Sequence, residues 1–146
     1  MKLEKPIFTL ALMLVAFTAQ AHVRVLPAEA QAGARQAYTV RVPTEGDAAT
    51  NSVELEVPNG VSVISIEGKA ETKKSGDRIV SIMWKMEIPP GESREFKFVA
   101  MNPASGQEIK WKAHQHFVDG STSDWVDVPA SSRPGPITKL RAAPPH

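Results

Sequence analysis

The stretch SVELEVP, residues 52–58, indicates the fold class because apolar and charged side chains alternate along it. An extended chain places Val53, Leu55 and Val57 on one side and the two intervening glutamates on the other. Alternation with a period of two, closed by a proline, is the pattern of a half-buried β-strand. The stretch therefore predicts a strand with one face in a core and the other in solvent.

The same pattern recurs along most of the chain. Seven further segments show short strand signatures bounded by Pro, Gly or Asn: 22–27, 37–43, 61–68, 78–88, 94–101, 108–118 and 123–128. We find no helical stripe longer than one or two turns between them. Short strands at this regular spacing predict a β-sandwich.

The first 21 residues have the three parts of a secretory signal peptide. Lys2 and Lys5 give a positive start, IFTLALMLVAF is apolar, and Ala19-Gln20-Ala21 supplies the small residues of a cleavage site. The apolar run is shorter than the roughly 20 residues that span a bilayer, although an N-terminal membrane anchor is the alternative. Cleavage there would make His22 the first residue of a periplasmic or secreted protein.

The composition excludes several function classes. The chain has a net charge of +1, and removal of the leader takes two lysines and one glutamate, so the mature chain is balanced. A neutral domain lacks the cationic contacts that nucleic-acid binding requires. The absence of cysteine excludes thiolate metal sites, and the motifs of phosphate loops, nucleophile elbows and zinc proteases are missing. No second apolar stretch approaches spanning length, so we expect a soluble mature domain without a membrane span.

His22 has a particular chemistry if it becomes the N-terminus. Its α-amine and its imidazole Nδ1 atom can bind one metal ion together and close a six-membered ring. Two such nitrogens suit Cu(II), which prefers nitrogen and oxygen ligands in a tetragonal arrangement. Two or more further donors must come from elsewhere. A histidine that follows a cleavage site by accident is the alternative.

The dipeptide Asp119-Gly120 predicts a β-hairpin with a two-residue type I′ turn. In that register His114 lies directly across from Trp125, on a polar face that also contains His116. The pattern His-x-His on a strand aims both imidazoles the same way, which is a common arrangement of metal ligands. A bulged or longer turn would shift the pairing by one residue. The alternatives are two solvated histidines and a tryptophan that covers the sheet edge.

Five motifs in order support a family resemblance. AHVRVLPAEAQAGARQAYTVRVPTE, VELEVPNGV, IPPGESREFKFVAMNP, QHFVDGSTSDW and RPGPITKL resemble the YcnI-like family of exported copper-binding domains, from His22 to about Leu140. The resemblance implies a compact β-sandwich related to other small periplasmic copper carriers. It also implies Cu(II) held by the N-terminal histidine as a single-histidine brace, with a carboxylate and a tryptophan at the site.

The resemblance assigns roles to particular residues. His22 matches the brace residue, and Trp125 matches the tryptophan after the Asp-Gly turn, where we expect it to cap the open face of the metal. Glu108 is the nearest match to the carboxylate, although it lies about 20 Å from His114 on a straight strand. His114 and His116 would replace or supplement that carboxylate.

The combined prediction is an all-β protein with a single immunoglobulin-like or cupredoxin-like β-sandwich. Residues 1–21 are the signal peptide, 22–140 the copper-binding domain and 141–146 a flexible tail. We expect the protein to carry or buffer Cu(II) and not to be an enzyme, with the copper ion and a membrane copper transporter or another periplasmic copper carrier as its partners. The alternatives are a metal-free assembly or interaction module and a copper-dependent oxidative enzyme.

Overall fold

The structure is a computed structural model that describes residues 3, 22–126 and 133–144. Every regular element in these residues is a β-strand, which confirms the all-β prediction. Within the same ranges no helix is long and apolar enough to cross a membrane. The predicted signal peptide, apart from Leu3, lies outside the described residues, as does the end of the predicted tail at His146.

Twelve strands form in the described residues. They are β1 (Arg24–Leu26), β2 (Glu29–Gln31), β3 (Arg35–Pro43), β4 (Thr50–Glu56), β5 (Ser62–Ile66), β6 (Glu71–Ser75), β7 (Arg78–Ile88), β8 (Ser93–Met101), β9 (Glu108–Lys110), β10 (Lys112–Phe117), β11 (Thr122–Trp125) and β12 (Ile137–Arg141). The predicted strand at 78–88 coincides with β7, and most other predicted strands agree within a few residues.

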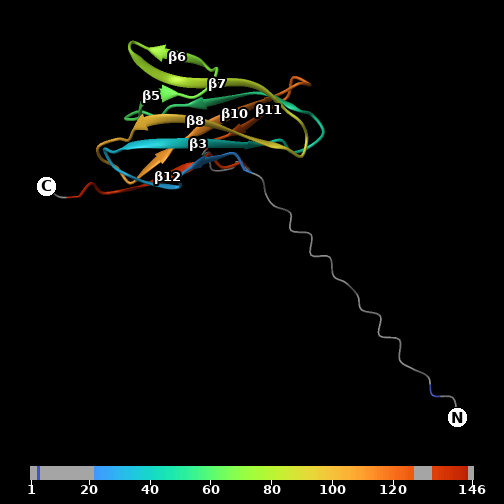
Figure 1. The fold of residues 1–146 in the computed structure, drawn as a ribbon, viewed down its shortest axis with the longest axis horizontal. Coiled ribbons are helices and arrows are strands. Elements are labelled where there is room, and N and C mark those ends of the chain that lie inside the picture. Colours follow the sequence, from blue (N-terminus) through green and yellow to red (C-terminus); the bar gives the residue numbers. More distant parts are fainter. Residues whose placement is uncertain (1–2, 4–21, 127–132, 145–146) are drawn as a thin grey trace.

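The strands form three sheets. A four-stranded sheet has the order β1-β3-β8-β5, a five-stranded sheet has the order β11-β10-β4-β7-β6, and a small sheet has the order β2-β12-β9. All neighbours are antiparallel except β2 and β12. Figure 1 shows the layers stacked, with β6 and β7 at the upper side and β12 at the lower side. β1 is an edge strand of the four-stranded sheet, and β11 is an edge strand of the five-stranded sheet.

The core lies between the two large sheets. Val40 and Phe98 reach it from the four-stranded sheet, and Leu55 and Ile82 reach it from the five-stranded sheet. The side chains of β4 alternate as the sequence predicts, because its apolar residues are buried while its glutamates remain partly exposed. Burial of such apolar area contributes about 25 cal/mol per Å² to folding, so the alternation of β4 fixes which of its faces points inward.

The structure divides the predicted strand at 108–118 into two. Trp111 interrupts it: the side chain is fully buried, and its backbone N–H donates to the carbonyl of Pro136 at 2.9 Å. β9 therefore leaves the large sheet and pairs with β12, while β10 continues beside β4. β2, β6 and β12 were not predicted; β6 is exposed at every position and offers no apolar alternation.

The prediction of a type I′ turn at Asp119-Gly120 is wrong. Gly120 has a φ of +86°, but no described non-glycine residue has a positive φ, and a type I′ turn requires one at both central residues. Phe117 N–H instead donates to Ser121 O, and Gly120 N–H donates to Phe117 O, both at 3.0 Å. These bonds enclose a three-residue loop with glycine in the left-handed position, a standard longer hairpin connection.

This loop shifts the hairpin register by one residue. Ala113 pairs with Trp125 and His114 pairs with Asp124, so the expected pairing of His114 with Trp125 is wrong. A one-residue shift moves a side chain to the opposite face of the sheet. Trp125 therefore points into the sandwich and is only 5% exposed, instead of lying on the polar outer face.

Candidate metal site

His22 and Trp125 lie in contact. Their ring centroids are 5.7 Å apart and the planes meet at 87°, an edge-to-face arrangement. His22 lies two residues before the start of β1, at the edge of the four-stranded sheet, whereas Trp125 ends β11 at the edge of the five-stranded sheet. Two of the three residues to which the family resemblance assigned a role, His22 and Trp125, are thus in contact between an edge of one large sheet and an edge of the other.

The position of His22 follows from the burial of its neighbours. Val23 and Val25 are 2% and 3% exposed, and β1 pairs with β3 through Arg24 to Leu26. This anchoring fixes the start of the strand, and the Nδ1 atom of His22 is itself buried. A cavity of about 290 Å³ lies beside it. Its lining consists of His22, Val23, Arg24, Val25, Leu26, Ala28, Pro134, Gly135, Pro136 and Ile137.

The indole of Trp125 has a fixed orientation. Its Nε1–H donates to Oε1 of Gln115 at 3.2 Å, inside the sandwich. The indole nitrogen is therefore engaged by Gln115. The guanidinium of Arg133 lies 6.0 Å from the ring centroid, within the range of a cation–π contact. The environment of this indole already accommodates a positive charge.

His114 lies on the outer face of the five-stranded sheet, opposite the face of Trp125. Its Nδ1 contacts Asp124 Oδ1 and its Nε2 contacts Glu56 Oε2, each at 2.7 Å. Partial burial lowers the pKa of His114, but the hydrogen bonds and charges of Asp124 and Glu56 outweigh it and raise the pKa above its ordinary value. Both ring nitrogens are engaged with carboxylates, so His114 links β4, β10 and β11.

The other two predicted ligands also lie away from the pair. His116 faces outward like His114, between Thr122 of β11 and Ser52 of β4. Glu108 begins β9 in the small sheet, and its carboxylate lies 3.6 Å from Lys110 Nζ. The structure thus unites His22 with Trp125 and distributes the remaining predicted ligands over other sheets and faces.

The donors that the structure brings together suit copper in part. In the described ranges 22–126 and 133–144, no group of three or more His, Asp or Glu side chains could hold a metal ion. A histidine with a free α-amine would supply two nitrogens, and an indole would supply a π-face, which attracts cations. His22 and Trp125 would thus supply only part of a copper site, and further donors would be needed.

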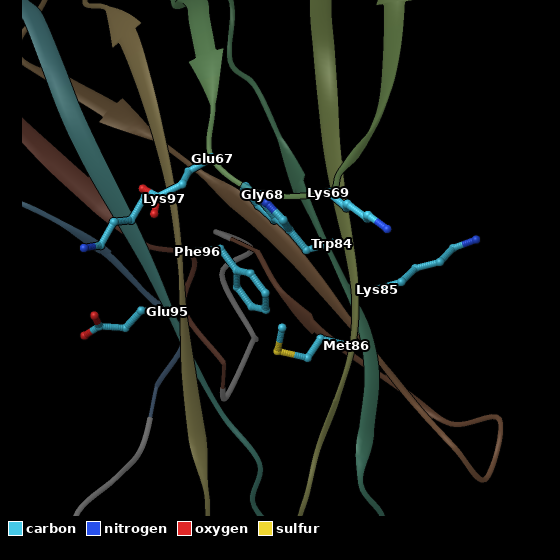
Figure 2. Close-up of a pocket in the computed structure, with 9 residues that line it drawn as sticks. All are labelled: Glu67, Gly68, Lys69, Trp84, Lys85, Met86, Glu95, Phe96 and Lys97. Carbon is cyan, nitrogen blue, oxygen red and sulfur yellow. The ribbon is translucent and has the colours of Figure 1, made fainter.

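A separate cavity of about 410 Å³ contains none of the predicted ligands (Figure 2). In Figure 2, Phe96 and Met86 approach each other in its centre, while Lys69 and Lys85 point away. Trp84 and Phe96 stack there with centroids 5.2 Å apart, as part of the core. Its lining residues give it no set of metal donors.

Sequence reasoning missed two residues beside Trp125. Gln115 was not among the predicted site residues, because the candidate ligands on this strand were the two histidines that flank it and point to the other face. Its inward position on an alternating strand was the available signal, since a buried amide needs hydrogen-bond partners. Arg133 gave no such signal, because it lies outside the predicted strands.

Comparison with known proteins agrees with the fold. The family model described as "Domain of unknown function (DUF1775)" matches residues 68–141. A solved structure of an uncharacterized protein from Nocardia farcinica, described as an immunoglobulin-like fold, matches with a TM-score of 0.67 at 26% identity, over 82% of this chain and 97% of that one. The predicted immunoglobulin-like sandwich is therefore confirmed.

A named relative is also similar in sequence. The copper-binding protein CutI of Bacillus subtilis strain 168 is 36% identical over 132 residues, which cover 86% of this chain. The match spans 65% of the length of CutI.

Proposed function

The chain belongs to the DUF1775 family, and from this premise we propose that it is an exported protein that carries or buffers Cu(II) through an N-terminal brace at His22. The similarity to CutI, a copper-binding protein, supports copper as the bound species. The fuller assignment rests on the chain's own residues.

The edge-to-face contact of His22 with Trp125 carries this proposal. The two residues lie far apart in the sequence, and no strand pairing joins them directly. A half-buried histidine beside a buried indole gives a cation one nitrogen ligand and one aromatic neighbour. Aromatic faces attract cations most strongly where water is excluded.

Cleavage after Ala21 completes the donor set in this proposal. The freed α-amine and the imidazole of His22 bind Cu(II) together, and the remaining positions are filled by donors that we leave unassigned. Trp125 covers the ion without donating its nitrogen, because that nitrogen hydrogen-bonds to Gln115. Export therefore creates the site, since the amine does not exist before cleavage.

We propose a carrier, not an enzyme, in the periplasm or outside the cell. Copper is its cargo, and a membrane copper transporter or another periplasmic copper carrier is the expected partner. A carrier must release its ion, and a brace at the margin of a sandwich leaves one side open to exchange. The cavity beside His22 supplies such an opening.

Mass spectrometry of the exported protein, with and without added copper, tests the proposal. The full chain is expressed in a secreting host, the exported product is purified, and native and denaturing spectra are compared. We expect a mass that begins at His22 and gains one copper ion, which a chelator removes. A product that retains residues before His22, or one that gains no copper, contradicts the proposal.

A further inference from the structure

A buried chain of hydrogen bonds ends on the indole of Trp125. Trp125 Nε1–H donates to Gln115 Oε1 at 3.2 Å, and Gln115 Nε2 donates to Pro43 O at 2.9 Å and to Thr50 Oγ1 at 2.6 Å. The hydroxyls of Thr50 and Thr44 lie 2.7 Å apart, and Thr44 also donates to the carbonyl of Ile88 at 2.9 Å. The chain thus links β11 and β10 with β3, β4 and β7.

Each bond in this chain has one allowed direction. An indole N–H can only donate, so the group of Gln115 that faces it must be the carbonyl oxygen. Both hydrogens of the amide then go to Pro43 and Thr50. Because Thr44 donates to Ile88, its oxygen accepts from Thr50. A flipped Gln115 would place its NH2 group against the N–H of Trp125, so that donor would face donor. The Gln115 side chain is therefore held in one orientation.

Burial of the Gln115 amide costs free energy of folding that an apolar side chain at the same position would not cost. Gln115 is 2% exposed, and Thr50 and Thr44 are 0% and 2% exposed. A buried amide costs free energy unless it is fully hydrogen-bonded, and an apolar side chain of similar size would fill the same space. One of the three bonds of Gln115 holds the indole of Trp125, the ring that lies edge to face with His22.

We propose that Gln115 is a positioning residue of the copper site and acts through Trp125. The inference rests on the proposed function. Gln115 binds the indole nitrogen inside the sandwich, and this holds the ring at its angle to His22. It also keeps the nitrogen away from the ion, so that Trp125 presents only its carbon framework. Partners one step removed from a metal commonly tune its affinity in this way.

Two variants of the exported full-length protein test the role. Gln115→Met removes the acceptor and leaves the Trp125 N–H without it, so Cu(II) affinity should fall by about 10- to 100-fold, the usual effect of losing a supporting partner. The EPR spectrum of bound Cu(II) should change as well. Gln115→Glu restores the acceptor for the Trp125 N–H and, in the neutral form that burial favours, keeps one of the two donor bonds, so it should recover the wild-type spectrum.

Thr138→Val is the matched control. Thr138 Oγ1 accepts from Trp111 Nε1 at 3.0 Å, so the variant deprives a different buried indole of its partner. It should lower the melting temperature as Gln115→Met does, but leave Cu(II) affinity and the EPR spectrum unchanged. If Gln115→Met does not fold, Gln115→Asn replaces it, because its amide is one methylene too short to span Trp125 and Thr50.

The outcomes separate the two claims. Weakened binding with an altered spectrum in Gln115→Met, its recovery in Gln115→Glu and an unchanged Thr138→Val support the positioning role. Wild-type affinity and spectrum in folded Gln115→Met or Gln115→Asn overturn that role and leave the proposed function standing. A wild-type protein that binds no Cu(II) overturns both.

Discussion

The imidazole of His22 meets the indole of Trp125 edge to face, with ring centroids 5.7 Å apart. The contact joins the segment that leads into β1 to the last residue of β11, and so bridges the two large sheets at their edges. An aromatic pair of this geometry contributes roughly 0.5–1.5 kcal/mol beyond the area it buries. It also places a metal-binding side chain beside a cation-attracting ring.

Copper should quench tryptophan fluorescence through Trp125. We expect Cu(II) to quench the emission of the wild-type protein, and Trp125→Phe to lose most of that quenching because the ring beside His22 is gone. Trp84→Phe is the control, since Trp84 stacks on Phe96 in the core. The measurement is a fluorescence titration. Equal quenching in wild type and Trp125→Phe would place the ion elsewhere.

Arg133 should weaken copper binding. Its guanidinium lies 6.0 Å from the Trp125 ring centroid, so a second cation at this ring meets a like charge. Like charges in a partly solvated site repel by about 1 kcal/mol, so Arg133→Ala should tighten Cu(II) binding by roughly three- to tenfold at low salt. Arg133→Lys keeps the charge and should behave as wild type. Competition titrations with a chelator measure the change; weaker binding in Arg133→Ala would refute this effect.

The histidines of β10 should be dispensable for copper binding at His22. His114 and His116 point outward, whereas Trp125 points into the sandwich. The double variant His114→Gln/His116→Gln should therefore keep the affinity and the nitrogen hyperfine pattern of the first bound Cu(II). A reduced nitrogen count in its EPR spectrum would return these side chains to the site.

Stability should depend on pH through His114. Asp124 and Glu56 raise the pKa of His114 above its ordinary value, so the folded state binds the proton more tightly than the unfolded state. The resulting stabilisation is fully present below about pH 6.5 and is lost as the pH rises through the raised folded pKa.

Melting curves of the metal-free protein at about pH 6 and pH 9 measure this dependence. Wild type should exceed His114→Gln in melting temperature more at the lower pH than at the higher one. His116→Gln leaves both carboxylate contacts of His114 in place and serves as the control. An equal difference at both pH values would show that the ion pairs contribute nothing measurable.

The fold was predictable from the sequence because its strands alternate strongly. Leu55 and its neighbours on β4 have one apolar face, and burial of that face fixes the strand in the core. β6 was not predictable in the same way, since all five of its side chains are exposed and only its pairing with β7 defines it. Where pairing rather than burial forms a strand, the alternation is absent.

The site was predictable only in part. The cleavage pattern pointed to His22 and the hairpin to Trp125, but only the family resemblance placed them in one site, because no local pattern shows that two edge strands of different sheets meet. The face of Trp125 was predicted wrongly, since Asp-Gly signals a hairpin without deciding between a two-residue and a three-residue loop. That one-residue difference moves Trp125 from the outer to the inner face, where it meets Gln115.

The most direct test of the central claim adds one residue before His22. Two exported proteins are compared, one that begins at His22 and one with a single glycine ahead of it, by Cu(II) titration and EPR spectroscopy. The added glycine moves the α-amine away from the imidazole but leaves the contact of His22 with Trp125 in place. The account predicts one tightly bound Cu(II) with a tetragonal spectrum in the first protein, and loss of that spectrum in the second. The same affinity and spectrum in both would contradict the brace.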